Sequence, residues 1–184
     1  MNKSPIFVCS HLAFILSLLL PLTCVQAGEA CGLYTKADVE TLFKQAVAAG
    51  VPHETMLPAG DSCRYSFNKN GETYSLKLRV SHSDAIKKEG IQDSAADVME
   101  RQKTARKNSS YAAKKFKQIP NLGTDAFWGG NDLWVLQDDT LLIISIHSFM
   151  DGSFPNMQAL QQAREQQDKA LSVQVAETVL ARLK

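Results

Sequence analysis

Motifs for enzyme chemistry are missing from this sequence. It contains no Gly-x-Ser-x-Gly segment and no Cys-x-x-Cys pair, so a serine hydrolase of the nucleophile-elbow type and a dithiol oxidoreductase are not expected. The histidines after residue 27 are His53, His82 and His147, and no two of them have helical or strand spacing. We therefore expect no metal site and no cofactor.

An excess of one charge and long apolar runs are also missing from most of the chain. The sequence has 20 Lys and Arg against 19 Asp and Glu, and removal of residues 1–27 takes away one lysine and no acid. A neutral remainder argues against nucleic-acid binding, which is typical of strongly basic domains. After residue 27 no apolar run reaches the roughly 20 residues that a membrane-spanning helix needs.

Residues 1–27 have the order of a secretory signal peptide. Lys3 precedes an apolar run from Ile6 to Leu22, and the small-residue site Val25-Gln26-Ala27 follows. A charged start, a short apolar core and a small-residue site are the three parts of a cleavable signal. We predict cleavage after Ala27 and export to the periplasm or the medium, which leaves residues 28–184 as one domain.

Two of the four cysteines, Cys31 and Cys63, remain after this cleavage. In an oxidising compartment an even pair is expected to form a disulfide. Two alternatives stay open. The thiols are unpaired, or a cut after Ala30 leaves a lipidated Cys31, although Gly28 stands where lipoprotein signals usually carry an aliphatic residue.

Helix starts are marked by polar caps. Thr35 and Asp38 form a capping box, and the apolar spacing after them predicts a helix that Gly50 closes. Ser94 and Asp97 begin a second helix that extends to about Arg106. A third helix is predicted over residues 156–183.

Strand patterns lie between these helices. Residues 62–67 and 74–80 are predicted strands around an Asn70-Gly71 turn. Cys63, Tyr65 and Phe67 share one face of the first strand, and Ser75, Lys77 and Arg79 form the one wet face of the second. A further hairpin is predicted over residues 132–150. Residues 51–60 contain two prolines and are interpreted as a loop.

The element order suggests one helix-strand-strand motif used twice. We predict an α+β two-layer sandwich, in which helices pack on one side of a mainly antiparallel sheet of four to six strands.

The segment Leu122-Gly123-Thr124-Asp125-Ala126-Phe127-Trp128, with a hairpin and a closing helix after it, resembles small exported bacterial proteins, among them LpqN-type lipoproteins. Cys-Gly-Leu at residues 31–33 and Cys-Arg-Tyr at 63–65 fit the same resemblance. The resemblance implies a PsbP-like α/β sandwich and an exported bacterial protein. It transfers no catalytic residue, and the lipid-attachment signal of the lipoprotein members is missing.

Residues 101–117 contain seven Lys and Arg and no acid, together with Tyr111 and Phe116. We interpret this basic segment as a positive patch that meets an acidic protein or an anionic envelope component. A solvated helix face is the alternative. The candidate partner-binding residues are Arg106, Lys107, Lys114, Lys115, Lys117 and Trp128.

Three large rings, Phe127, Trp128 and Trp134, lie around Gly129-Gly130. They form either a partner surface or a part of the core near a sheet edge. His147 is the one histidine placed as a catalytic base would be, with Ser145 on the same strand face, which keeps a hydrolase as an alternative. A histidine of the core or its rim is the simpler interpretation.

We therefore predict a non-enzymatic exported binding or accessory protein that contacts a protein or an envelope component. A periplasmic inhibitor or immunity-type protein of an envelope-acting enzyme is the first alternative, and a hydrolase that uses His147 is the second.

Overall fold

A computed structural model describes residues 28–183 of the chain. The signal-peptide prediction for residues 1–27 lies outside the described residues. Within the described part, no helix has both the length and the apolar character that a membrane span requires.

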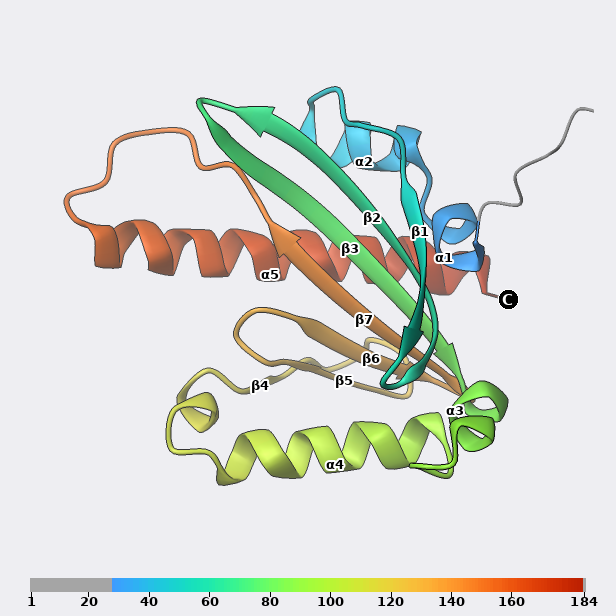
Figure 1. Ribbon diagram of the computed structural model, residues 1–184. Helices are drawn as coiled ribbons and strands as arrows, with labels where there is room; N and C mark the ends of the chain where they lie inside the picture. The colour runs from blue at the N-terminus through green and yellow to red at the C-terminus, as the bar shows by residue number, and fades with distance from the viewer. Residues whose placement is uncertain (1–27, 184) are drawn as a thin grey trace, which may run out of the picture.

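A single antiparallel sheet forms the centre of the fold (Figure 1). Its seven strands have the spatial order β1-β2-β3-β7-β6-β5-β4. The α+β class with an antiparallel sheet is confirmed, and the strand number exceeds the expected four to six. The strands are β1 (Val51–Met56), β2 (Ala59–Lys69), β3 (Glu72–His82), β4 (Lys117–Gln118), β5 (Asp125–Trp128), β6 (Leu133–Gln137) and β7 (Thr140–His147).

Five helices accompany the sheet, and three of them begin where they were predicted, two of these at predicted polar caps. They are α1 (Glu29–Leu33), α2 (Lys36–Phe43), α3 (Ser83–Glu89), α4 (Ala95–Asn108) and α5 (Met157–Arg182). The side chains of Thr35, Ser94 and Asn156 accept backbone hydrogen bonds at the starts of α2, α4 and α5. The predicted extension of α2 to Gly50 is wrong, because Lys44 adopts a left-handed conformation that ends the helix.

Helices cover both faces of the sheet at β6 and β7, which corrects the expectation of helices on one side. Alternate residues of β7 belong to different buried clusters, and α5 contributes to one cluster whereas α3 and α4 contribute to the other. Leu142, Ile144 and Ile146 pack toward α5, and Leu141 and Ile143 pack toward α4. This half of the fold therefore has three layers.

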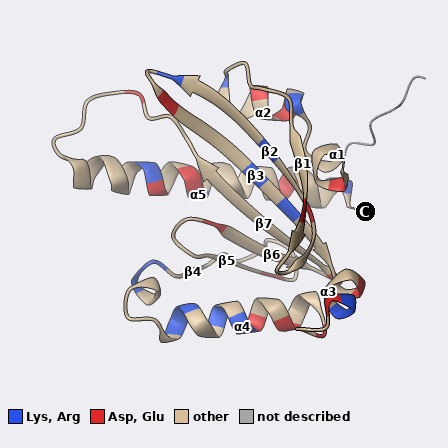
Figure 2. Ribbon diagram, in the orientation of Figure 1, with Lys and Arg blue, Asp and Glu red and all other residues tan. Residues whose placement is uncertain are grey.

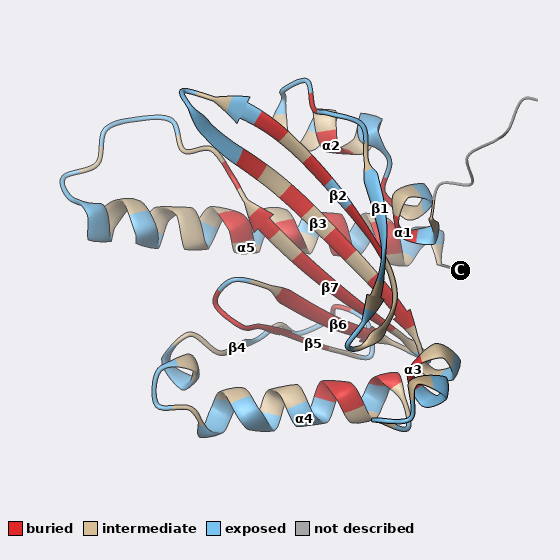
Figure 3. Ribbon diagram, in the orientation of Figure 1, coloured by how far each residue is buried: buried red, intermediate tan, exposed pale blue. Residues whose placement is uncertain are grey.

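The other half of the sheet, β2 and β3, is covered on one face only. Cys63, Tyr65, Leu76 and Leu78 belong to the cluster that contains α1, α2 and α5. The cluster under α4 contains no residue of β2 or β3. Buried and accessible residues accordingly alternate along both strands in Figure 3. Helices leave the second face of β2 and β3 uncovered, and this face is accessible around Arg64 and Lys77, whereas Ser62 on it is 1% exposed.

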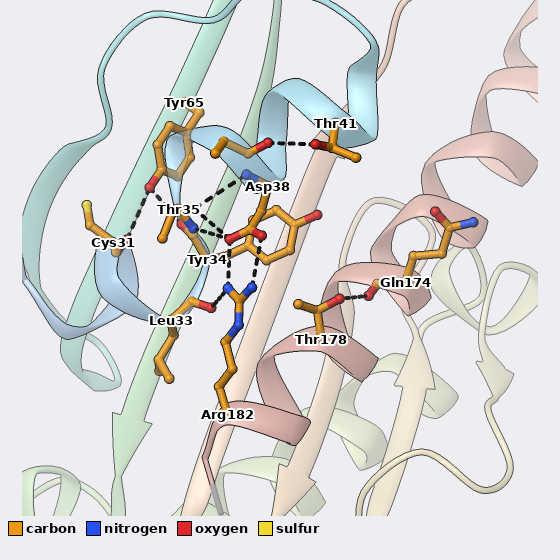
Figure 4. A network of polar contacts seen from close by, with 11 residues as sticks. Cys31, Leu33, Tyr34, Thr35, Asp38, Thr41, Tyr65, Gln174, Thr178 and Arg182 are labelled. Atoms are coloured by element: carbon orange, nitrogen blue, oxygen red, sulfur yellow. Dashed lines mark hydrogen bonds and ion pairs between the residues drawn. The ribbon is translucent and has the colours of Figure 1, made fainter.

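The disulfide predicted from the cysteine count is present. Cys31 of α1 and Cys63 of β2 are bonded across a sequence separation of 32 residues. The Tyr65 hydroxyl donates hydrogen bonds to the carbonyls of Cys31 and Tyr34, at 3.3 and 2.6 Å. The short helix α1 is thus fixed to β2 by a covalent bond and by the Tyr65 hydrogen bonds, which Figure 4 shows.

The two ends of the described chain meet at Asp38 (Figure 4). Its carboxylate accepts two hydrogen bonds from Thr35 and two from the Arg182 guanidinium, at 2.7 and 2.9 Å. Arg182 also donates to the Leu33 carbonyl at 2.7 Å. These bonds, above all those from Arg182, hold the pKa of Asp38 well below its usual range.

This lowered pKa predicts an acid dependence of stability. The native state favours the ionised carboxylate, so Asp38 contributes stability above the unfolded-state pKa of about 3.9, and the contribution is lost as the pH falls below that value. We expect Asp38→Asn to lower the free energy of unfolding by about 1 kcal/mol at pH 7, a modest value because Arg182 is partly exposed.

Urea denaturation at pH 7 and pH 3 measures this effect. The difference between Asp38→Asn and the wild type should shrink at pH 3. Glu177→Gln, which neutralises an exposed carboxylate of α5, is the matched control and should change stability little. A constant Asp38→Asn difference at both pH values would contradict the assignment.

Candidate functional site

The basic segment spans the second half of α4, a short 3₁₀ turn over Ala112–Lys114, and β4. Three of its seven cations form ion pairs with distant acids: Lys103 with Asp125 at 2.7 Å, Arg106 with Asp132 at 3.0 Å, and Lys115 with Glu165 at 2.8 Å. Hydrogen bonds to these acids raise the pKa of Lys103 and of Lys115. Two of the predicted contact residues, Arg106 and Lys115, thus attach the segment to the rest of the fold.

Lys107, Lys114 and Lys117 are exposed and form no ion pair with any residue of 28–183. The ammonium of Lys107 lies 5.2 Å from the centre of the Phe116 ring. Lys117 lies opposite Trp128 in the β4–β5 register. A partner contact at these three lysines stays a prediction.

The rings around Gly129-Gly130 lie in the core. Trp128 is 2% exposed and packs in the cluster that contains α5, while Phe127 and Trp134 are buried on the opposite face toward α4. The Arg106 guanidinium donates to the Gly129 carbonyl at 3.0 Å and so fixes the turn between β5 and β6. Trp128 is therefore a residue of the core, and its ring offers almost no surface to a partner.

His147 ends β7, where its ring stacks on Tyr74 with a centroid distance of 5.5 Å. Within residues 28–183 its ring forms no hydrogen bond with Ser145 or with another hydroxyl. A serine and a buried acid do meet nearby, because both the backbone N–H and the hydroxyl of Ser148 donate to the Asp168 carboxylate.

This Ser148 contact does not have the geometry of a hydrolase. A nucleophilic serine is activated by a base that lies between it and the acid, whereas Ser148 bonds directly to Asp168. Burial raises the pKa of Asp168. Gln167 of α5 donates to the Ser148 hydroxyl at 2.9 Å, so the cluster attaches the end of β7 to α5. Hydrolase activity through His147 stays a prediction.

A hollow of about 630 Å³ lies between the β1–β2 hairpin and α3. Its lining includes the acids Glu29, Glu54, Asp61 and Glu89. His82 joins them through a 2.9 Å contact with Glu29. No group of residues in 28–183 has an arrangement suited to a metal ion. The lining also includes Lys88, so its acidic side chains outnumber its basic ones.

The open face of β2 and β3 carries three cations that the sequence analysis did not bring together. Arg64 of β2 lies directly opposite Lys77 of β3 in the register, and Arg79 follows on the same face of β3. Figure 2 shows Lys and Arg in the middle of both strands. We call Arg64, Lys77 and Arg79 the open-face triad.

The triad has no counter-charge among the described residues. None of its members forms an ion pair there. Burial, followed by the charges of Arg79 and Arg64, lowers the pKa of Lys77. Like charges opposite each other on a sheet are destabilising. The fold therefore holds a positive cluster at a cost in stability.

Arg79 is the most enclosed of the three. Its Nη1 donates to the Leu57 carbonyl in the β1–β2 turn at 2.9 Å, while its Nε is buried without a partner in residues 28–183. Burial lowers the pKa of Arg79. A guanidinium presents five donors, so the bond to Leu57 uses only part of the donor capacity of Arg79.

Comparison of the chain with protein-family models, with curated proteins and with solved structures gave no match. The resemblance to LpqN-type proteins and the PsbP-like fold therefore stay predictions.

Proposed function

We propose that the chain is an exported, non-enzymatic binding protein that holds an anionic partner on the open-face triad. The observation that carries this proposal is a like-charged group of Arg64, Lys77 and Arg79 without an acid to pair with. Such a group is stabilised when a ligand supplies the missing negative charge. Its position on a strand pair of a disulfide-linked sheet keeps the three cations in a fixed arrangement.

The basic segment lies on the same side of the sheet as the triad. Arg79 is in register with Ile143, and Ile143 with Trp134. Both apolar residues pack against α4, which contains the start of the basic segment. The proposal needs only the triad, so the exposed lysines of the basic segment provide the comparison in the experiment below.

A charge-reversal experiment tests the proposal. We expect Arg64→Glu/Lys77→Glu to bind immobilised heparin, a simple polyanion, about tenfold to a hundredfold more weakly than the wild type, since two charge-assisted contacts are lost. Both residues have accessible side chains. Circular dichroism and thermal unfolding should confirm that the variant is folded.

Lys107→Glu/Lys114→Glu is the matched control, because it changes the net charge by the same amount on the basic segment. We expect it to retain most of the affinity. Equal losses in the two variants would mean that only net charge matters. A loss confined to the control would place the site on the basic segment, and either result would overturn the proposal.

A further inference from the structure

We infer that the anionic partner is an acidic segment of another protein, bound in extended form along β3 over Arg64, Lys77 and Arg79. This inference rests on the proposed function and specifies its ligand.

The spacing of the cations matches an extended polypeptide. Lys77 and Arg79 are two positions apart on one strand and share its open face, which places them about 7 Å apart. Alternate side chains of an extended peptide have the same spacing. Aspartates or glutamates at every second position would therefore meet successive cations, and Arg64, opposite Lys77, would contact the same carboxylate.

Polar groups without partners lie beside Lys77 and Arg64. Ser66 and Ser75 face each other across β2 and β3, and Ser145 of β7 lies opposite Lys77. All three are half-buried. Within residues 28–183 their hydroxyls form no hydrogen bonds. Hydroxyls both donate and accept, so they suit the N–H and C=O groups of a peptide backbone.

Apolar side chains border the triad on the β1 side. Val51, opposite Arg64 on β1, is 49% exposed, and Leu57, whose carbonyl bonds to Arg79, is 66% exposed. Arginine is enriched in protein interfaces. A peptide with apolar side chains beside its acids fits this combination.

Two other polyanions fit the surface less well. A flat anionic membrane would contact Arg64 and Lys77 but not the more enclosed Arg79, whereas a single extended strand can follow all three cations. Single-stranded nucleic acid usually stacks its bases on accessible aromatic rings. On this face of the sheet the rings of Phe127 and Trp134 are buried toward α4.

The experiment compares two synthetic peptides of the same composition. One has glutamate at every second position among valine and threonine, and the other has its glutamates in one contiguous block. We expect the alternating peptide to bind the wild-type protein at least about tenfold more tightly by fluorescence anisotropy at low salt. Arg64→Glu/Lys77→Glu should lose this preference, whereas Lys107→Glu/Lys114→Glu should keep it.

Vesicles that contain phosphatidylglycerol and the heparin matrix separate this inference from the proposed function. If vesicles or heparin bind through the triad and the alternating peptide has no advantage, the extended-peptide inference is overturned and the proposed anion site stands. If no probe depends on the triad, both are overturned. Tighter, triad-dependent binding of the alternating peptide supports both.

Discussion

Replacement of both disulfide cysteines, in Cys31→Ser/Cys63→Ser, is expected to lower the free energy of unfolding by about 3 to 4 kcal/mol. The bond closes a loop with a sequence separation of 32 residues, and removing it returns that loop's freedom to the unfolded chain. In the folded state, loss of the bond should disturb mainly α1, because this helix has 5 residues and a helix of this length does not persist alone.

Urea denaturation of the double variant and of the wild type, with and without reductant, measures this loss. The reduced wild type should approach the stability of the double variant, since both lack the cross-link. The Tyr65 hydrogen bonds to the Cys31 and Tyr34 carbonyls remain in both, so unfolding should stay cooperative. A difference below about 1 kcal/mol would mean that the tyrosine and the core fix α1 without the disulfide.

The starts of the helices could be predicted because they depend on short-range chemistry. Thr35, Ser94 and Asn156 each accept a backbone hydrogen bond from a residue three positions later. The end of α2 could not be predicted in the same way. Apolar spacing continues to Val47, yet the chain leaves the helix at Lys44, and Val47 joins the core from a non-helical segment.

The strand β1 was missed because Pro52, Pro58 and Gly60 made residues 51–60 resemble a loop, although only Pro52 lies in β1. Pro52 lies on an edge strand, where a missing N–H is tolerated. A pattern in the sequence indicates that β6 and β7 are also covered on the α4 face, and the prediction did not use it. Residues 133–136 and 141–144 are continuous apolar runs, which are typical of strands buried on both faces.

The pairing of Arg64 with Lys77 in the open-face triad could also have been predicted from the sequence. The Asn70-Gly71 turn sets Lys69 opposite Glu72, and the same register places Arg64 opposite Lys77. Sequence reasoning noted the wet face of the second strand without extending it across the hairpin. The enclosure of Arg79 depends on Leu57, and the pairing of Arg106 with Asp132 depends on the path of α4. Such tertiary contacts have no local signal.

Substitution of the buried indole, Trp128→Ala, is expected to lower the free energy of unfolding by about 3 to 5 kcal/mol, the usual cost of deleting a core aromatic side chain. Trp128 is 2% exposed and joins β5 to the cluster that contains α5. Its indole N–H has no hydrogen-bond partner in residues 28–183. Trp128→Phe should therefore cost clearly less, because it removes volume without removing a hydrogen bond.

Tyr111→Ala is the matched control, since this aromatic residue of the basic segment is 72% exposed and should change stability by less than about 0.5 kcal/mol. Urea denaturation measures stability, and heparin affinity is measured where each variant is folded. Because Trp128 lies in the core, Trp128→Phe should be less stable than the wild type. It should bind heparin like the wild type, because the ring lies on the opposite face of the sheet from the triad. Unchanged stability with weakened binding would instead place the ring in a partner contact, and the anionic partner would then have to reach both faces of the sheet.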